Sequence, residues 1–354
     1  MTIPPLQIGS LTASIPIVQG GMGVGISLSG LASAVANTGG IGVISGTQIG
    51  FGEADFYKNP LQANIRALRK EIRKAKEKSP KGIIGINFLT ALQNYTEMVK
   101  TAVEEKIDII FSGAGLPVDL PALVKGSQTK IVPIVSSPKA ALVITKLWSR
   151  KYDYLPDAMV VEGPEAGGHL GFTKEQLQEK SSQTELATLL QKTKEVLVSF
   201  EVERKQRIPL IAAGGIFTGQ DIRKYINLGA QGVQMGTRFI ATEECDAPLS
   251  FKEQYLNLSP EKIVLIESPV GLPGRALYNS FTNKAQKEKI PVQRCLSCLK
   301  TCNPKQTPYC ISEALIQAVQ GNPTKGLLFA GSTACRMNKI IAVSELMREL
   351  IQSI

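Results

Sequence analysis

The chain has very little histidine: only His169 occurs among its 354 residues. A relay of protons between two histidines is therefore excluded. Long apolar runs are also missing, since no stretch approaches the ~20 apolar residues that a membrane span needs. The first residues lack the basic start and the apolar core of a signal peptide. We therefore expect a cytoplasmic protein with no membrane partner.

Positive charge is in excess, but it is not concentrated at one place. The net charge is +10, and 43% of the residues are hydrophobic, which is typical of a soluble globular protein with a large core. The densest basic group lies within residues 66–78, where it alternates with Glu71 and Glu77 on a helical pattern. A solvated helix face explains this group better than a nucleic-acid site does. A weaker reading is attraction of anionic ligands, such as a phosphate cofactor, acyl-CoA or an acidic acyl carrier protein.

Short apolar runs alternate with helical patterns through the first two thirds of the chain. Eight runs are mostly continuous and rich in Ile and Val, as expected for strands buried on both faces of a parallel sheet. They lie at residues 15–19, 41–44, 82–88, 107–111, 131–135, 158–162, 209–213 and 232–235. Helical patterns fill the gaps at residues 29–37, 54–78, 92–105, 138–150, 184–204 and 218–228. The alternation predicts an α/β fold, a (β/α)8 TIM barrel over residues 1–243, with an open doubly wound sheet as the competitor.

Two segments depart from this repeat. Residues 173–207 are long, polar and charged, and we expect them to form a helical insertion above the barrel mouth, after the sixth strand. Residues 244–354 form a C-terminal extension, which we expect to pack on the barrel. Its pattern predicts a strand at 263–267 and helices near 312–319 and 343–352.

Glycine-rich strings follow three of the predicted strands. The first, at residues 19–25, lets backbone amides approach a ligand closely, although its spacing is not the G-x-G-x-x-G of dinucleotide sites. Gly214 and Gly215 follow the seventh strand, and Gly236 and Thr237 follow the eighth. In barrels the loops after these two strands commonly form a phosphate site. Simple turn chemistry is the alternative for each string.

Polar residues also stand at the ends of other strands. Asn87 ends the third strand and offers both donors and acceptors, which suits a flavin ring edge or ribityl chain. Glu162 ends the sixth strand, and Ala166 and Gly167 lead from it to His169. Small residues beside a single imidazole leave room for a flat group, which favours a chemical role for His169. The alternatives are a structural histidine and a solvated loop carboxylate.

Together these segments resemble the nitronate monooxygenase family, formerly 2-nitropropane dioxygenases, and the related FMN-dependent enoyl-ACP reductases II. The resemblance runs over residues 16–243, and its most specific string is Glu-Ala-Gly-Gly-His at residues 165–169. It implies a barrel that binds FMN at its C-terminal mouth, with His169 facing the substrate. The residues that would hold FMN by this likeness are Gly21, Met22, Asn87, Gly214, Gly215, Gly236 and Thr237. Glu162, Ala166 and Gly167 complete the set of candidate cofactor-binding residues.

Four of the six cysteines are crowded together, in a stretch that the resemblance does not cover. Cys295, Cys298, Cys302 and Cys310 lie within 16 residues. Soft thiolates select iron–sulfur clusters or zinc, and this spacing suits a four-iron four-sulfur cluster better than zinc. The alternative is a set of reduced cysteines that pack as small hydrophobes.

Three hypotheses for the function follow. The favoured one is FMN-dependent oxidation of alkyl nitronates with O2 to a carbonyl compound and nitrite, with His169 binding the nitro oxygens or acting as a base. The second is reduction of an enoyl thioester on acyl carrier protein or CoA, with NAD(P)H as co-substrate and His169 near the thioester carbonyl. The third is a non-catalytic flavin or iron–sulfur redox sensor. A homodimer is left open.

Overall fold

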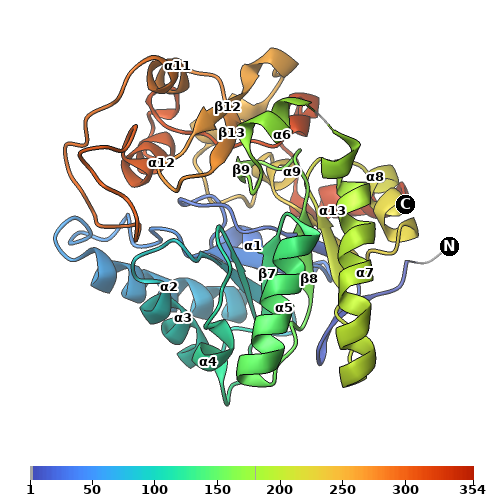
Figure 1. The fold of residues 1–354 in the computed structure, drawn as a ribbon. Helices are drawn as coiled ribbons and strands as arrows, with labels where there is room; N and C mark the ends of the chain where they lie inside the picture. Colours follow the sequence, from blue (N-terminus) through green and yellow to red (C-terminus); the bar gives the residue numbers. More distant parts are fainter. Residues whose placement is uncertain (1–2, 180) are drawn as a thin grey trace.

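A closed barrel of eight parallel strands forms the centre of the molecule (Figure 1). The computed structural model describes residues 3–179 and 181–354. Neighbouring strands follow one another around the barrel in chain order, and β11 pairs with β3 to close it. The strands are β3 (Ile17–Gln19), β4 (Ile41–Ser45), β5 (Ile83–Leu89), β6 (Ile109–Gly113), β7 (Lys130–Val135), β8 (Met159–Glu162), β10 (Leu210–Ala213) and β11 (Gly232–Met235). The predicted TIM barrel is thus confirmed, and the open sheet is excluded.

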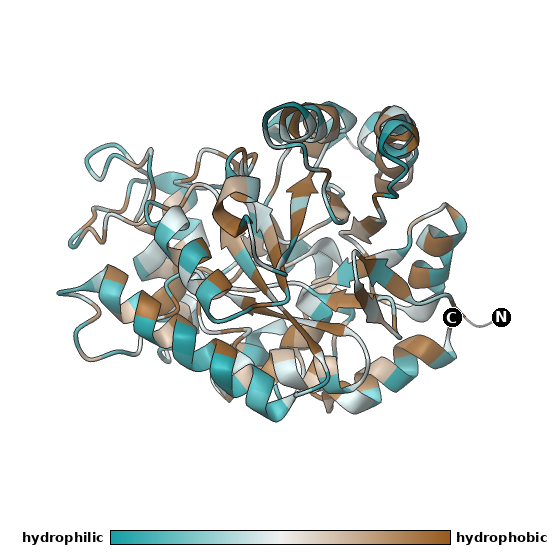
Figure 2. Cartoon of the chain, turned by 90° about the horizontal axis from the view of Figure 1, so that it is seen from below, coloured by the Kyte–Doolittle hydropathy of each residue, from teal (hydrophilic) through white to brown (hydrophobic). Residues whose placement is uncertain are grey.

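Helices form the outer ring and bury one face each against the strands. They are α1 (Ser29–Asn37), α2 (Pro60–Lys78), α3 (Tyr95–Glu104), α4 (Leu120–Val124), α5 (Pro138–Tyr152), α7 (Leu186–Arg204) and α8 (Gly219–Asn227). Figure 2 shows hydrophobic residues along the strands and hydrophilic residues along the outer helix faces. In α2, Leu68 and Ile72 are buried at a spacing of four residues, while the basic residues of the same helix face outward, as an amphipathic helix requires.

An N-terminal hairpin that the sequence pattern did not predict contributes to the barrel interior. Strands β1 (Leu6–Ile8) and β2 (Leu11–Ala13) pair antiparallel. Leu6, Ile8 and Ala13 belong to the same buried cluster as inward-facing strand residues such as Val160 and Phe111. The barrel interior is therefore a packed core, which leaves ligand chemistry to the ends of the strands.

The expected insertion at residues 173–207 is shorter than predicted. Helix α7 contacts α5, β8 and β10, so it is the barrel's own connecting helix between two neighbouring strands. Its buried residues Leu186, Leu190 and Leu197 recur on one face. The added part is limited to β9 (Gly168–His169), α6 (Lys174–Glu179) and η1 (Ser182–Thr184). The charged residues of α7 lie on its solvent face. Because of them, the sequence pattern was interpreted as an insertion, although α7 is an ordinary barrel helix.

The extension that begins near residue 244 covers one end of the barrel and then returns to its side (Figure 1). Its strands β12 (Ile263–Glu267) and β13 (Pro273–Leu277) form a three-stranded antiparallel sheet with β9. Its helices are α10 (Leu249–Lys252), α11 (Ser280–Lys287), α12 (Ile311–Val319) and α13 (Val343–Gln352). Short 3-10 helices are η2 (Glu253–Tyr255), η3 (Pro260–Lys262), η4 (Pro323–Lys325) and η5 (Ser332–Arg336).

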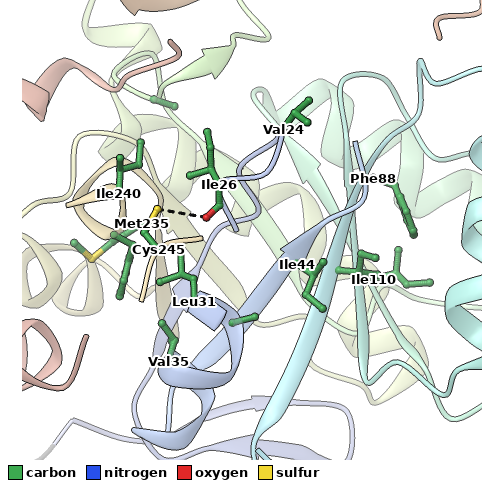
Figure 3. Close-up of a cluster of buried hydrophobic side chains, with 14 of the residues drawn as sticks. Val24, Ile26, Leu31, Val35, Ile44, Phe88, Ile110, Met235, Ile240 and Cys245 are labelled. Carbon is green, nitrogen blue, oxygen red and sulfur yellow. Dashed lines mark hydrogen bonds between the residues drawn. The ribbon is translucent and has the colours of Figure 1, made fainter. Parts of the chain in front are cut away.

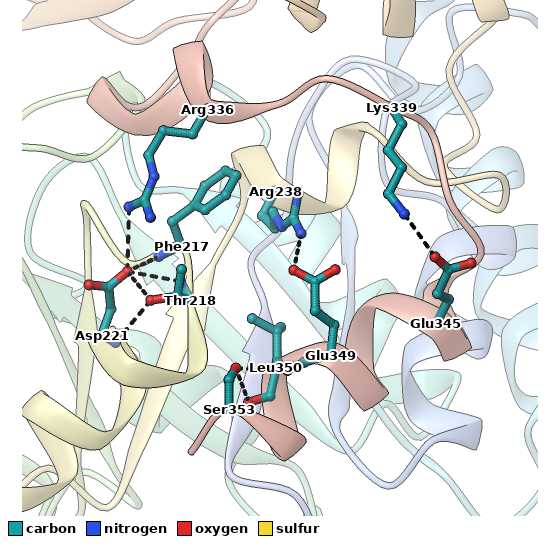
Figure 4. Close-up of polar contacts among 10 residues, drawn as sticks. All are labelled: Phe217, Thr218, Asp221, Arg238, Arg336, Lys339, Glu345, Glu349, Leu350 and Ser353. Carbon is teal, nitrogen blue, oxygen red and sulfur yellow. Dashed lines mark hydrogen bonds and ion pairs between the residues drawn. The ribbon is translucent and has the colours of Figure 1, made fainter.

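Helix α13 completes the outer ring. The helix directly after β11, α9 (Thr237–Ile240), has only four residues and cannot cover the last strand. Helix α13 contacts both α1 and α8, which leaves it in the position of the missing eighth helix. Arg238 donates to Glu349 of α13 at 2.8 Å (Figure 4). A Cβ on Gly219 of α8 would come within 2.2 Å of the Leu350 carbonyl oxygen of α13, so α8 and α13 are in close contact at this glycine.

The segment after β3 is fixed by apolar contacts with the start of the extension. Val24, Ile26 and Leu31 are buried with Ile240 and Cys245 in the cluster that Figure 3 shows. The Cys245 thiol donates to the Ile26 carbonyl oxygen at 3.4 Å. These contacts hold the first glycine-rich string against the end of the barrel. Across residues 3–179 and 181–354, no helix has both the length and the apolar character needed to cross a membrane.

Candidate active site

One cavity of about 220 Å³ lies at the carboxyl ends of the barrel strands, where barrel enzymes carry their active sites. Every one of the eight strands, or the loop that follows it, contributes to its lining. All the residues proposed for FMN and substrate line this cavity: Gly21, Met22, Asn87, Glu162, Ala166, Gly167, His169, Gly214, Gly215, Gly236 and Thr237. The structure thus brings the whole predicted set together, while the role of each residue stays a prediction.

The loops after β10 and β11 form a region suited to an anion. Gly214 and Gly215 have φ angles of +98° and +76°, which L side chains rarely adopt, so these loops stay bare of side chains. The Thr237 hydroxyl accepts a bond from the Gly331 amide at 2.9 Å, which leaves its proton free for a ligand. The next residue, Arg238, also lines the cavity.

Two buried polar atoms in this region lack a partner among the described residues. They are Arg238 Nε and Ser332 Oγ. Ser332 lies between Gly331 and Thr333, which both line the cavity. A buried donor without a partner costs about 1–3 kcal/mol, so such atoms indicate a ligand group that they would bind. We expect a phosphate at this end of the cavity to be that ligand group, since its oxygens are strong acceptors.

Other parts of the cavity wall are bare backbone as well. A Cβ on Gly21 would lie 2.5 Å from the Asn87 Cβ, and a Cβ on Gly167 would lie 2.5 Å from the Gly331 amide nitrogen. No side chain larger than hydrogen fits at either position. The Asn87 amide donates only a long bond, 3.5 Å, to the Phe111 carbonyl oxygen, so it stays available to a ligand. Together with the anion region, this lining fits a flat ring that ends in a phosphate, as FMN does.

Glu162 is an uncharged acid at neutral pH. Burial raises the pKa of its carboxyl to about 8, and the nearby Arg275 guanidinium only partly offsets that rise. The Arg275 guanidinium does not lower the pKa of Glu162 further because it donates to backbone carbonyl oxygens instead. Its partners are the carbonyl oxygen of Pro164 and that of Ala166, the latter at 2.6 Å. These bonds fix the loop that leads to His169.

His169 is a neutral imidazole at the same pH. It lies on β9, where it pairs with Gly274 of β13, and its Nε2 is 2.8 Å from Ser268 Oγ. The Phe329 ring contacts it edge-on at 4.9 Å between centroids. Burial by these walls lowers the pKa of His169 to about 4. The ring is still partly exposed because it faces the cavity, and no described residue hydrogen-bonds its Nδ1.

Sequence reasoning missed the residues that the extension supplies to the cavity. Ser268 and Phe329 contact His169, and Gly331 and Thr333 line the cavity. All of them lie 99 or more residues after His169 in the chain. The local sequence pattern therefore does not predict that they lie close to His169 in space. One signal was present, since Ala-Gly-Ser-Thr at residues 330–333 is a further string of small and hydroxyl residues.

The four clustered cysteines do not reach this cavity and instead line a second one. In the part of the chain that the structure describes, no three His, Cys, Asp or Glu side chains are placed to hold a single metal ion. This finding is against zinc at the cysteines, because four thiolates around one zinc would lie roughly 3.8 Å apart. The predicted metal site therefore has no support as a site for one ion.

Comparison with known proteins identifies the family and the fold of the chain. A family model described as nitronate monooxygenase matches residues 5–353. A probable nitronate monooxygenase of Staphylococcus aureus is 26% identical over 296 residues, 77% of each chain. FabK from Thermotoga maritima superposes with a TM-score of 0.72 and 28% identity, covering 96% of this chain and 92% of that one.

The name of a further curated relative contains a CoA thioester. The chain is 28% identical over 272 residues to (3aS,4S,5R,7aS)-5-hydroxy-7a-methyl-1-oxo-octahydro-1H-indene-4-carboxyl-CoA dehydrogenase of Mycobacterium tuberculosis. The match covers 77% of this chain but only 65% of the length of that relative.

Proposed function

The chain belongs to the nitronate monooxygenase family, and from that membership we propose that it oxidises alkyl nitronates with O2 to carbonyl compounds and nitrite. Members of the family are flavin-dependent oxidoreductases, which argues against a purely non-catalytic sensor. In net balance, two nitronate anions and one O2 give two carbonyl compounds and two nitrite ions. The observation that carries the proposal is the neutral His169 at the wall of a cavity suited to FMN.

The residues of the cavity divide the binding of FMN between them. Gly214, Gly215, Gly236 and Thr237 would hold the phosphate together with Arg238 Nε and Ser332 Oγ. Gly21, Met22, Asn87, Ala166 and Gly167 would hold the ring and the ribityl chain, and Glu162 would donate its carboxyl proton to a ribityl or ring acceptor. When bound, FMN supplies the redox chemistry by taking electrons from the substrate and passing them to O2.

The protonation state of His169 selects a substrate that is already ionised. A base whose conjugate acid has a pKa of about 4 removes protons from a neutral nitroalkane poorly at pH 7. A nitronate has already lost that proton and needs only orientation. Because Nε2 is engaged with Ser268, Nδ1 is the atom left to bind a nitronate oxygen. The imidazole then acts as a hydrogen-bonding group and not as the general base.

Anaerobic mixing of the FMN-loaded protein with a preformed nitronate tests this proposal. We expect the flavin absorption to bleach within the mixing experiment and to return when O2 is admitted, with release of nitrite. The neutral nitroalkane of the same carbon skeleton is the matched control, and we expect bleaching at least tenfold slower with it. If the nitronate leaves the flavin oxidised, the proposed activity is wrong.

A second candidate is reduction of an enoyl thioester. The observation in its favour is the curated relative whose substrate is named as a CoA thioester, at 28% identity. The site also offers a proton donor for such a reaction, because Glu162 keeps its proton up to about pH 8. Steady oxidation of NADH or NADPH that requires both FMN and an enoyl thioester would favour this candidate. Oxidation that proceeds equally without the thioester would count against it.

A further inference from the structure

Four thiols that the active site does not use converge on one cavity. The cavity measures about 300 Å³ and is lined by Cys295, Cys298, Cys302 and Cys310. The remaining cysteines of the chain do not line it. Thiolate ligands are thus gathered at one place from a segment of 16 residues.

Backbone pairing with the barrel holds the first part of this segment in place. The Gln93 amide donates to the Cys298 carbonyl oxygen at 3.0 Å, and the Lys300 amide donates to the Ala91 carbonyl oxygen at 3.0 Å. Leu92 and Leu299 form an antiparallel bridge between these bonds. The cysteine loop is therefore attached to the loop after β5. Leu89, the last residue of β5, lines the active-site cavity.

The cavity between the thiols has room for more than one ion. No three of these thiols are placed to hold one metal ion. A cavity of about 300 Å³ holds far more than one ion, since roughly 10–15 Å³ of such volume is enough for a water molecule. A cluster of four irons and four sulfides separates its four thiolate ligands much more widely than zinc does. The four thiols in the wall and the volume of the cavity favour such a cluster.

The surroundings of the thiols suit an anionic cluster. The Ser297 amide donates to Cys295 Sγ at 3.3 Å. Hydrogen bonds of this kind stabilise cluster sulfurs. Leu296 and Leu299 are buried in the wall. Residues 284–310 carry six Lys or Arg and one acidic residue, so their charge opposes the net −2 of a cluster with four thiolates.

We propose that this cavity binds a four-iron four-sulfur cluster through the thiolates of Cys295, Cys298, Cys302 and Cys310. In Figure 1 the loop that carries the first three of them joins α11 to α12, and Cys310 precedes α12 directly. Leu315, five residues further along α12, lines the active-site cavity. At 1.5 Å per residue, Cys310 and Leu315 are about 7–8 Å apart along the helix axis. The proposal rests on the cysteines alone and does not depend on the substrate of the flavin.

Anaerobic reconstitution of the full chain with Fe²⁺ and sulfide tests the proposal. We expect about four iron atoms and four sulfides per chain, and an EPR signal after reduction by dithionite. Cys298→Ser and Cys310→Ser are expected to lose at least half of the bound iron. Cys335→Ser is the matched control, because Cys335 is also partly buried but lies outside the cavity, and it should keep the full iron content.

Flavin content separates a lost cluster from a lost fold. The serine variants should keep FMN at the level of the unchanged chain, since the cavity that would bind it uses none of these cysteines. Stoichiometric zinc in place of iron, no sulfide in the reconstituted protein, or equal iron loss in Cys335→Ser would each overturn the proposal. These results would leave the nitronate experiment unaffected, because it reads the flavin and not the iron.

Discussion

His169 Nε2 lies 2.8 Å from Ser268 Oγ, a residue 99 positions later in the chain. The imidazole comes from the loop after β8, whereas the hydroxyl comes from the extension, between β12 and β13. The barrel alone therefore does not fix the ring that faces the cavity. The extension orients it through Ser268, through the Phe329 ring and through the pairing of β9 with β13.

We expect His169→Ala to keep FMN and to lose most turnover. The imidazole lines the cavity, and its hydrogen bond in the described chain is to Ser268 and not to a phosphate-region residue, so flavin content should stay within a factor of two. Loss of a positioned hydrogen-bonding group at the reacting centre typically costs about 10²- to 10³-fold. Flavin stoichiometry and kcat/KM with a nitronate measure the two effects. A variant that loses its flavin would show that His169 is structural.

We expect Ser268→Ala to lower turnover about tenfold without affecting flavin content. Ser268 fixes which ring nitrogen of His169 faces the cavity, and its removal frees the ring to rotate. As a positioning residue it should lower kcat more than it raises KM. Ser268→Thr, which keeps the hydroxyl, should recover part of the rate. Ser250→Ala is the control, because Ser250 is exposed on α10. Equal losses in Ser268→Ala and Ser250→Ala would contradict the prediction.

The parallel strands and the residues at their ends could be predicted because each depends on local pattern. Continuous apolar runs such as residues 41–44 and 232–235 coincide with β4 and β11 to within one residue. The glycine strings after the first, seventh and eighth strands therefore lie at the carboxyl ends of the barrel strands. The hairpin β1–β2, strand β13 and the position of α13 were not predicted, because each depends on contacts with distant segments. The partners of His169 were missed for the same reason.

Glu162 should make the stability of the flavin-depleted protein fall as the pH rises. The carboxyl has a pKa of 4.5 when unfolded and about 8 when folded, so the folded state holds a proton that the unfolded chain has lost. His169 has the opposite effect on stability, because its pKa falls from 6.5 in the unfolded chain to about 4 in the folded protein. Its contribution therefore makes the stability rise with pH, but only up to about pH 6.5. Between pH 6.5 and 8 the free energy of unfolding should therefore drop by up to about 1.4 kcal/mol per pH unit.

Urea unfolding at several pH values measures this slope. Glu162→Gln removes the titrating carboxyl and should flatten the decline between pH 6.5 and 8. Glu203→Gln is the control, because Glu203 is exposed near the end of α7 and should leave the slope as it is. A slope that survives in Glu162→Gln would mean that another group titrates in this range.

Gly21→Ala should weaken FMN binding at least tenfold. Its Cβ would lie 2.5 Å from the Asn87 Cβ, so either the glycine loop or Asn87 must move out of the ring region. A glycine of the loop before α2 gives a matched control: a Cβ on Gly52 has nothing within 4 Å. Flavin titration of both variants and a thermal melt of each flavin-free protein separate binding from folding. If Gly52→Ala and Gly21→Ala bind FMN alike, the ring does not lie against Gly21.

Ser332→Ala should distinguish FMN from riboflavin, which lacks only the phosphate. In the described chain Ser332 Oγ is buried without a partner, beside loops that are bare of side chains. If the phosphate is its partner, removal of the hydroxyl loses one hydrogen bond to a charged group, about 1.5–3 kcal/mol or roughly 10- to 150-fold in the Kd for FMN. The same change removes an unpaired buried donor from the flavin-free protein, so its stability should stay equal or rise.

Riboflavin should bind both forms with the same affinity. A parallel loss of FMN and riboflavin affinity would show that Ser332 acts on the ring or on the loop, and the phosphate would then have to lie elsewhere in the cavity.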